Sequence, residues 1–290
     1  MTQILNTLLQ QAGLRKPPCV LDNITRMREK DGIALYRVSV GAERFVAKCF
    51  QNEAYRREIA NYRLLQKLAI PTLRVAAATD AALLLEDVTQ SAALRLGEEA
   101  DLSDCAAAVL LARWYRLLHD KGRDFPAHTS APLYEDTDIL TQETLAGIAA
   151  KTDTAENLLW PLLLGALPQL KALLAQTEKT LVYNDFYYTN FALARDGSHA
   201  LMFDYNLLGS GYAYADVRNV CSSLSVQAGK TFLAEYGAVN PQEKRLDAVL
   251  SPLVTLHYAC ARESLPQWAK PSLAQLTGGA LEQGLIALLG

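Results

Sequence analysis

The sequence contains few cysteines and histidines, and it has no concentration of charge of one sign. The five cysteines, at positions 19, 49, 105, 221 and 260, form no Cys-x-x-Cys pair, and the four histidines show no metal-binding spacing. A zinc site or a redox motif is therefore not expected, and the thiols are expected to be reduced and buried. Lysine and arginine number 28 against 31 acidic residues, without a basic cluster, so nothing favours nucleic acid as a partner.

Long hydrophobic runs are also missing. The longest, residues 158–170, is broken by Pro161, Gly165 and Pro168 and is shorter than the ~18 residues that span a bilayer. The first 14 residues carry no positive charge before their apolar residues and no small-residue cleavage site, unlike a signal peptide. We therefore expect no membrane partner and a cytoplasmic protein. Apolar residues nevertheless make up 50% of the sequence, which is enough for a hydrophobic core. The length of 290 residues corresponds to about two domains or one two-lobed domain.

The first 88 residues predict a small, mostly antiparallel sheet with one long helix. Leu35–Val40, Phe45–Phe50 and Leu83–Val88 are rich in β-branched, aromatic and aliphatic residues, and 41–44 form a turn between the first two. Apolar residues at helical spacing predict a helix over 52–68, after a short amphipathic helix over 3–12.

The remainder is predicted to be mainly helical, with helices over 101–120, 138–150, 155–176 and much of 216–290. A strand–turn–strand passage interrupts them between Leu181 and Asp204 and turns at Asp196-Gly197. We therefore expect an α+β protein with two lobes, an N-terminal one over 1–88 and a larger helical one over 89–290.

Lys48 is the first candidate functional residue along the chain. Strand alternation places it on the same face as Val46 and Phe50. It is either a solvated edge lysine or a lysine that contacts ligand phosphates from a strand, as in kinase-like enzymes. Glu58 has no cationic residue three or four positions away, so a buried Glu58 needs a distant partner, and we predict a Lys48–Glu58 ion pair.

The most specific signal lies between residues 181 and 204. An apolar strand leads to Asp185, Asn190 follows five residues later, and a second apolar strand leads to Asp204. Phosphoryl transfer uses such a set, because one carboxylate accepts the proton of the attacking hydroxyl while another carboxylate and an amide oxygen hold Mg²⁺. Turn formation and strand capping explain each residue singly, but they do not explain the set in this order.

These residues resemble the aminoglycoside phosphotransferase and choline/ethanolamine kinase superfamily, which has the protein-kinase-like fold. The resemblance covers about residues 20–225. Tyr183-Asn184-Asp185 with Asn190 matches its catalytic loop, His-(Gly/Asn)-Asp-x-x-x-x-Asn, and Asp204-Tyr205-Asn206 matches its metal motif, Asp-(Phe/Trp)-Glu.

The resemblance also implies roles for residues outside these two motifs. Leu83–Asp87 resembles the hinge that meets the adenine, which makes Glu86 and Val88 nucleotide-binding residues along with Lys48 and Glu58. Asp216 resembles the aspartate that supports the catalytic loop, although a helix N-cap explains it equally.

Three positions depart from the family pattern. Tyr183 stands in place of histidine, Asn206 stands in place of glutamate, and the nucleotide-binding hairpin around Arg28–Gly32 has one glycine instead of several. The first two leave open a nucleotide-binding pseudokinase without efficient catalysis. A protein kinase is disfavoured, because the chain has no Asp-Phe-Gly and no Ala-Pro-Glu.

The resemblance implies a small-molecule kinase that uses ATP and Mg²⁺, with Asp185 as the catalytic base or positioning group and Asn190 and Asp204 at the metal. Six of the 13 tyrosines lie between residues 183 and 214. They either pack under the catalytic loop or form an aromatic pocket, with Tyr187 and Tyr212, for a cationic acceptor. The acidic stretch 135–138 could add attraction, so we predict an amine-bearing alcohol, such as choline, ethanolamine or an aminoglycoside, over a neutral sugar. The oligomeric state stays open.

Overall fold

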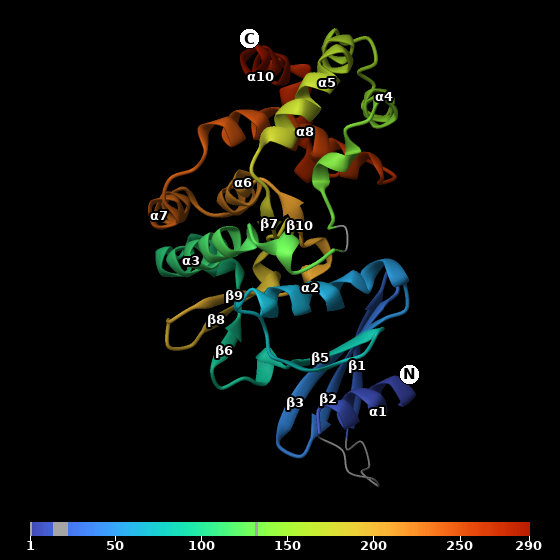
Figure 1. Ribbon diagram of the computed structural model, residues 1–290, viewed down its shortest axis with the longest axis vertical. Helices are drawn as coiled ribbons and strands as arrows, with labels where there is room; N and C mark the ends of the chain where they lie inside the picture. Colours follow the sequence, from blue (N-terminus) through green and yellow to red (C-terminus); the bar gives the residue numbers. More distant parts are fainter. Residues whose placement is uncertain (1, 14–22, 131–132) are drawn as a thin grey trace. The chain divides into compact units, whose positions relative to one another are not determined.

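The computed structural model describes residues 2–13, 23–130 and 133–290 (Figure 1). The helices are α1 (Thr2–Gln11), α2 (Arg57–Lys67), α3 (Cys105–Gly122), α4 (Gln142–Lys151), α5 (Leu159–Gln176), α6 (Ala213–Ser223), α7 (Val226–Tyr236), α8 (Pro241–Cys260), α9 (Lys270–Thr277) and α10 (Ala280–Leu289). The strands are β1 (Asn23–Lys30), β2 (Ile33–Val40), β3 (Glu43–Phe50), β4 (Val75–Ala78), β5 (Ala82–Glu86), β6 (Leu94–Leu96), β7 (Thr180–Val182), β8 (Phe191–Ala194), β9 (Ala200–Met202) and β10 (Gly209–Gly211). This content confirms the predicted α+β class, with an N-terminal antiparallel sheet and a large helical part.

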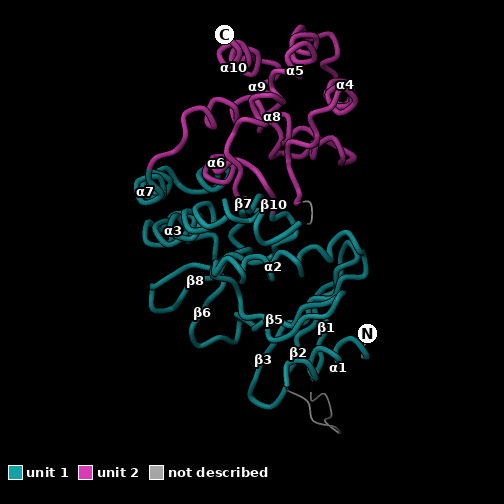
Figure 2. Tube along the Cα trace, in the orientation of Figure 1, with its two compact units in different colours: residues 1–131, 183–208, 219–237 teal, residues 132–182, 209–218, 238–290 magenta. Residues whose placement is uncertain are grey.

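The chain divides by its internal packing into two compact units (Figure 2). Unit 1 comprises residues 1–131, 183–208 and 219–237, and unit 2 comprises residues 132–182, 209–218 and 238–290. Each unit draws on separate stretches of the sequence. The division into lobes at residue 88 stays a prediction.

A five-stranded antiparallel sheet in the order β1-β2-β3-β5-β4 opens unit 1. The strands predicted at 35–40 and 45–50 are confirmed as parts of β2 and β3. The third predicted strand ends at Glu86, because Val88 begins a 3₁₀ turn. Sequence patterns missed β1 and β4, since β1 is mostly charged or polar and β4 is a short run of small residues.

The two faces of this sheet have different surroundings. On one face Val38, Phe45, Ala47 and Leu84 pack with apolar residues of α1. The other face presents Lys48 toward α2, which carries Glu58. The helix predicted over 52–68 starts later, at Arg57, after a 3₁₀ turn that the Asn52 side chain caps.

The strand–turn–strand passage predicted over 181–204 is divided between two sheets. β8 and β9 form a hairpin that turns at Asp196-Gly197 and pairs with β6, as the sequence predicts for the turn. β7 instead pairs with β10 in unit 2. The segment between β7 and β8 is therefore a loop in which Asp185 and Asn190 lie.

Unit 2 is built around a helical core. Buried residues of α5 and α8, mostly leucines, form more than half of it, together with residues of α4, α9 and α10. The helices predicted from 138 and 155 begin at Gln142 and Leu159, where the side chains of Thr141 and Asn157 accept hydrogen bonds from backbone N–H groups. Within the described residues, no helix is long and apolar enough to cross a membrane.

The described cysteines are free thiols. Cys49 is buried, as expected. The prediction that all the thiols would be buried is wrong for three cysteines in helices α3, α6 and α8, which are half-buried: Cys105, Cys221 and Cys260. Cys19 lies outside the described residues.

Candidate functional site

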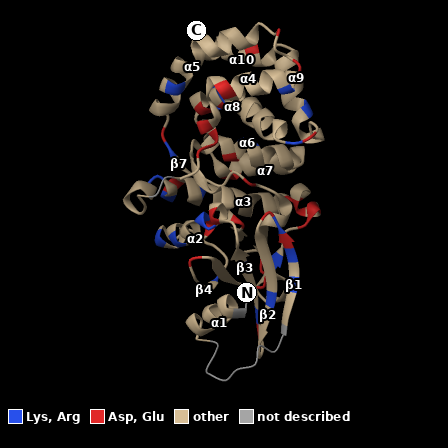
Figure 3. Ribbon diagram, turned by 90° about the vertical axis from the view of Figure 1, so that its right-hand side faces the viewer, with Lys and Arg blue, Asp and Glu red and all other residues tan. Residues whose placement is uncertain are grey.

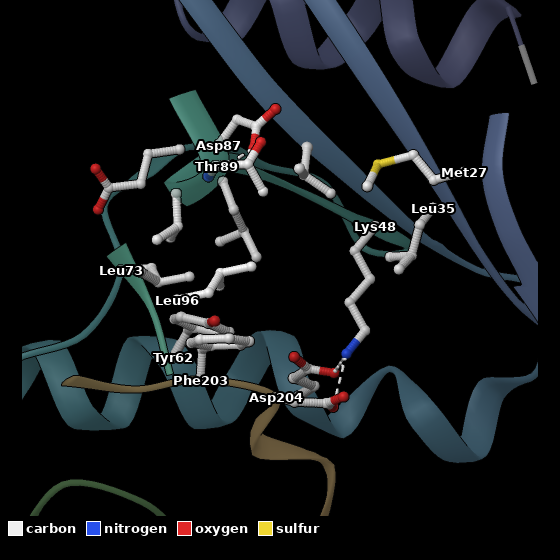
Figure 4. A pocket seen from close by; sticks show the side chains of 15 residues that line it. Met27, Leu35, Lys48, Tyr62, Leu73, Asp87, Thr89, Leu96, Phe203 and Asp204 are labelled. Atoms are coloured by element: carbon white, nitrogen blue, oxygen red, sulfur yellow. Dashed lines mark hydrogen bonds and ion pairs between the residues drawn. The ribbon is translucent and has the colours of Figure 1, made fainter. Parts of the chain in front are cut away.

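Lys48 lies at the centre of the site in unit 1. Its Nζ is 2.6 Å from Glu58 Oε2 and 2.8 Å from Asp204 Oδ1, and it also faces the Phe50 ring at 5.6 Å. Figure 4 shows Lys48 reaching from the sheet toward Asp204. The predicted Lys48–Glu58 ion pair is therefore confirmed, and the pair with Asp204 joins the sheet to the second motif.

The charges of these three residues depend on one another. Burial disfavours the Lys48 ammonium, but the two carboxylates outweigh burial and raise the pKa of Lys48 above its ordinary value. Burial raises the pKa of Glu58, and the Lys48 ammonium opposes this rise. A cation at Lys48 is therefore held inside the protein at neutral pH.

The catalytic-loop motif folds into a compact turn after β7. The Asn190 Nδ2 group donates to the main-chain oxygen and to Oδ2 of Asp185, both at 3.1 Å. Asn184 adopts a left-handed conformation with φ of 65°, and its side chain donates to the carbonyl of Leu207 at 3.1 Å. The loop thus holds together the two residues that the resemblance assigns to the catalytic loop.

Tyr183 is fully buried below this loop. Its hydroxyl donates to the carbonyl of Phe203, the residue before Asp204, and its ring packs edge-on against Tyr205 with centroids 5.8 Å apart. Tyr205 packs in the same way on Tyr62 of α2 at 4.8 Å. These buried tyrosines anchor the two motifs, as the packing interpretation of the tyrosine enrichment predicts.

Asp185 has an unusual acidity. Burial, and then the negative charge of Asp204, raise its pKa to about 6, while Lys48 and the hydrogen bond from Asn190 oppose the rise. A carboxyl with this pKa is mostly ionised at neutral pH but binds a proton more readily than an exposed aspartate. Such a group is suited to general-base chemistry.

The Asp204 motif offers oxygen atoms for a cation. Asp204 has a left-handed φ of 63° and accepts a hydrogen bond from Asn206 Nδ2 at 2.7 Å, while Asn206 Oδ1 is buried without a hydrogen-bond partner. The described residues contain no cluster of three metal-binding His, Cys, Asp or Glu side chains. This donor set fits Mg²⁺, which takes one or two side-chain oxygens and completes its shell with phosphate and water.

Two cavities of unit 1 meet at Lys48 and Asp204. The first, of about 180 Å³, is mainly apolar, and the predicted nucleotide-binding residues Glu86 and Val88 line it. The second, of about 210 Å³, is more polar and also borders Asn206. The arrangement offers an apolar chamber for a flat ring and a charged chamber beside it.

Sequence patterns missed a charged pair in the segment predicted to be the hinge. Asp87 is buried, and its Oδ2 accepts from Arg37 Nε of β2 at 2.7 Å. Its Oδ1 accepts from the backbone N–H of Thr89, at 3.0 Å, and thereby caps the 3₁₀ turn that begins at Val88. An aspartate directly before a turn is a capping signal, but Arg37 lies 50 residues away and only the sheet joins them.

The remaining predicted residues are outside this group. Tyr187 is 55% exposed, and its ring packs at a tilt of 32° against Tyr188 with centroids 4.7 Å apart. Tyr212 and Asp216 belong to unit 2 and are buried there, and the Tyr212 hydroxyl donates to Asp247 at 3.0 Å. The acceptor-pocket role of the two tyrosines and the supporting role of Asp216 stay predictions.

Two residues of the acidic stretch 135–138 have polar partners within unit 2. Glu135 forms an ion pair with Lys179 at 2.6 Å, and Tyr134 donates a hydrogen bond to Asp136. Burial and the charge of Asp216 raise the pKa of Asp136 to about 6, against the attraction of Arg218. This stretch is therefore not simply a solvated acidic loop.

Comparisons with known proteins identify the fold and the family of this chain. Choline kinase LicA from Streptococcus pneumoniae is 12% identical with a TM-score of 0.63, over 99% of both chains. Macrolide 2'-phosphotransferase MphH from Brachybacterium faecium is 15% identical with a TM-score of 0.59, over 95% of this chain and 98% of that one. The streptomycin–ATP–APH(2")-IIa ternary complex is 15% identical with a TM-score of 0.60, over 95% of this chain and 96% of that one. No curated protein matches the chain.

The similarity to these solved structures confirms the expected protein-kinase-like fold. A family model described as the phosphotransferase enzyme family matches residues 32–249, well over half of the chain, and the match includes Lys48, Glu58, Asp185 and Asp204. The predicted resemblance to aminoglycoside phosphotransferases and choline/ethanolamine kinases is confirmed, and this chain belongs to the phosphotransferase enzyme family.

Proposed function

We propose that this protein transfers the terminal phosphoryl group of ATP to a hydroxyl group of a small molecule, with Mg²⁺. The observation that carries this proposal is the junction at Lys48. A buried ammonium lies between Glu58 and Asp204, and it borders both the apolar and the polar cavity. Phosphoryl transfer depends mainly on positioning and charge stabilisation, which a fixed cation beside a ring-sized chamber provides.

Each residue has a role in this proposal. The hinge around Glu86 and Val88 meets the base, and Lys48, oriented by Glu58, contacts the phosphates. Asp204 and Asn190 hold Mg²⁺, which when bound neutralises phosphate charge. Support for a nucleotide ligand comes from relatives of the same fold, whose structures contain ATP or AMP.

Asp185 serves the acceptor in this proposal. Its pKa of about 6 lets it accept or orient the proton of the attacking hydroxyl at neutral pH. Asn190 fixes its carboxylate through the hydrogen bond at 3.1 Å. The proton then resides on Asp185 until it is released to water.

The direct test is ATP consumption by the purified protein with Mg²⁺ and a panel of amines, amino alcohols, sugars and aminoglycosides. We expect acceptor-dependent release of ADP, and equimolar phosphorylated acceptor by mass spectrometry. Binding of ATP without turnover of any acceptor would favour the pseudokinase alternative. Absence of ATP binding would contradict the proposal as a whole.

For the acceptor, we propose an amine-bearing alcohol rather than a neutral sugar. Support comes from the exposed Tyr187 ring and its neighbour Tyr188 in unit 1, since aromatic faces attract cations. The test is competition among choline, ethanolamine, an aminoglycoside and neutral sugars at millimolar concentration. Phosphorylation of a neutral sugar with every amine inert would end this proposal and leave the phosphotransferase assignment intact.

A further inference from the structure

The β1–β2 hairpin is cationic where a phosphate-binding loop usually offers glycine. Gly32 is its only glycine, and it follows Arg28 and Lys30 near the end of β1. A glycine-rich loop binds phosphate through backbone N–H groups, because glycine without a Cβ lets the backbone approach the ligand closely, and a hairpin with one glycine allows less of this approach. Figure 3 shows segments of Lys and Arg, in blue, along β1.

A bulge in β1 decides which way these cations face. The register places Arg26 opposite Tyr36 but Arg28 opposite Leu35, so Met27 is the extra residue. In an unbroken strand, residues two apart share a face. The bulge places Arg26 and Arg28 on opposite faces instead.

The cross-strand partners identify the two faces. Tyr36, opposite Arg26, packs toward the α1 side of the sheet. Leu35, opposite Arg28, lies in register with Lys48 on the cavity side. Lys30 is opposite Ile33, which also lines the polar cavity. The bulge therefore turns Arg28 and Lys30 toward the cavity and leaves Arg26 on the far side.

The polar cavity has an excess of positive charge. Three cations line it, against two carboxylates: Arg28, Lys30 and Lys48, with Asp31 and Asp204. Arg28 forms no ion pair with any described residue, and Lys30 has only a loose, exposed contact with Asp31 at 3.8 Å. Both cations are thus available to a ligand in this cavity.

We propose that Arg28 and Lys30 bind the β- and γ-phosphates of the nucleotide and that these side chains replace the amide groups of a glycine-rich loop. The proposal rests on the proposed function. Arg28 offers a planar fork that matches two phosphate oxygens, and Lys30 adds a compact charge. Affinity then resides largely in the triphosphate, while the apolar cavity binds the base.

The test compares the Arg28→Gln/Lys30→Gln double variant with Arg26→Gln, a matched control on the same strand and the opposite face. Isothermal calorimetry measures binding of ATP, inorganic tripolyphosphate and adenosine. We expect the double variant to bind ATP and tripolyphosphate at least about tenfold more weakly, since two charge-assisted contacts are lost, with adenosine affinity unchanged. The control should match the unaltered protein for all three ligands.

Salt provides a second readout. ATP affinity of the unaltered protein should fall as ionic strength rises, and the fall should be smaller in the double variant, because exposed charges are screened. Unchanged ATP affinity in the double variant would overturn this inference and leave the proposed function intact. An equal loss of adenosine binding, or an equal loss in the control, would also overturn it. Failure of the unaltered protein to bind ATP would overturn both.

Discussion

At the residue scale, Asp185 combines a structural and a chemical property. It is held by Asn190 in a loop that Tyr183 and Asn184 fix from below, so its carboxylate has little freedom. Burial and Asp204 raise its pKa to about 6. The same neighbours that position the group therefore also tune its affinity for a proton.

We predict that Asp185→Asn lowers kcat by about 10²- to 10⁴-fold, the usual loss when a positioned base is removed, with little change in ATP affinity. In the unaltered protein, kcat/KM should fall as pH drops through about 6, because protonated Asp185 cannot accept a proton. Steady-state kinetics from pH 5 to pH 8 measure both. Asp196→Asn, at the exposed β8–β9 turn, is the control, and full turnover by Asp185→Asn would refute the catalytic role.

The contributions of Lys48 and Glu58 to ATP binding should depend on each other. If Glu58 acts by orienting Lys48, the double alanine variant should lose little more ATP affinity than Lys48→Ala alone, because both changes remove a shared interaction. Calorimetric binding of ATP to the two single variants and the double variant completes the cycle. Strictly additive losses would show that the residues act independently.

At the scale of elements, the turn after β5, which is predicted to be the nucleotide hinge, depends on a contact with β2. Arg37 on β2 reaches Asp87 after β5, and its Nη2 also donates to Thr89 Oγ1 at 3.1 Å. Asp87 is almost fully buried, so its charge needs this partner. β2 therefore supports the turn that follows β5.

Arg37→Gln should raise the KM for ATP about three- to tenfold and leave kcat within about twofold, since it disturbs the base-binding turn and not the reacting groups. Steady-state kinetics with ATP as the varied substrate measure the split. Arg44→Gln is a suitable control, because the Arg44 side chain bonds to carbonyls of its own hairpin. A fall in kcat at unchanged KM would assign Arg37 to a different role.

At the scale of the whole molecule, the division of roles follows the two units. Lys48, Glu58, Asp185, Asn190 and Asp204 all belong to unit 1, although they come from stretches up to 156 residues apart. Unit 2 supplies a helical core and a separate polar cluster around Asp136, Arg218 and Asp247. The stability of unit 2 should therefore respond to pH independently of the group of residues around Lys48 in unit 1.

We predict that Asp136 makes the folded chain less stable as pH rises from about 4 to above 6. Its folded pKa of about 6 exceeds the ordinary value of 3.8, so its ionised form is disfavoured in the folded state. Below pH 4 the Asp136 carboxyl is protonated in both the folded and the unfolded state, so it no longer lowers the free energy of unfolding. Asp136→Asn should raise the free energy of unfolding at pH 7.5 by about 1–2 kcal/mol but leave it nearly unchanged at pH 4.

Thermal melts of the unaltered protein and the variant at both pH values test this prediction. The neighbouring Asp138 is exposed, so Asp138→Asn provides a control that changes the same net charge. An equal gain in both variants would point to overall charge and away from Asp136. A loss of stability at pH 7.5 in Asp136→Asn would contradict the prediction.

The amino-acid sequence by itself determined the features that depend on local spacing. Strand alternation and helical periodicity placed Lys48 and Glu58 on inward faces. Secondary-structure periodicity fixes neighbours within an element. The inward orientation of both side chains could therefore be predicted before any tertiary contact was known.

Only the tertiary structure decided which distant residues meet. The Lys48–Asp204 and Arg37–Asp87 contacts join residues 156 and 50 positions apart, and no local pattern specifies them. The bulge at Met27 is invisible in a charged strand without alternation, yet it turns Arg28 to the opposite face from Arg26. Local propensity sets the element, whereas strand register and packing set which side chains face the same cavity.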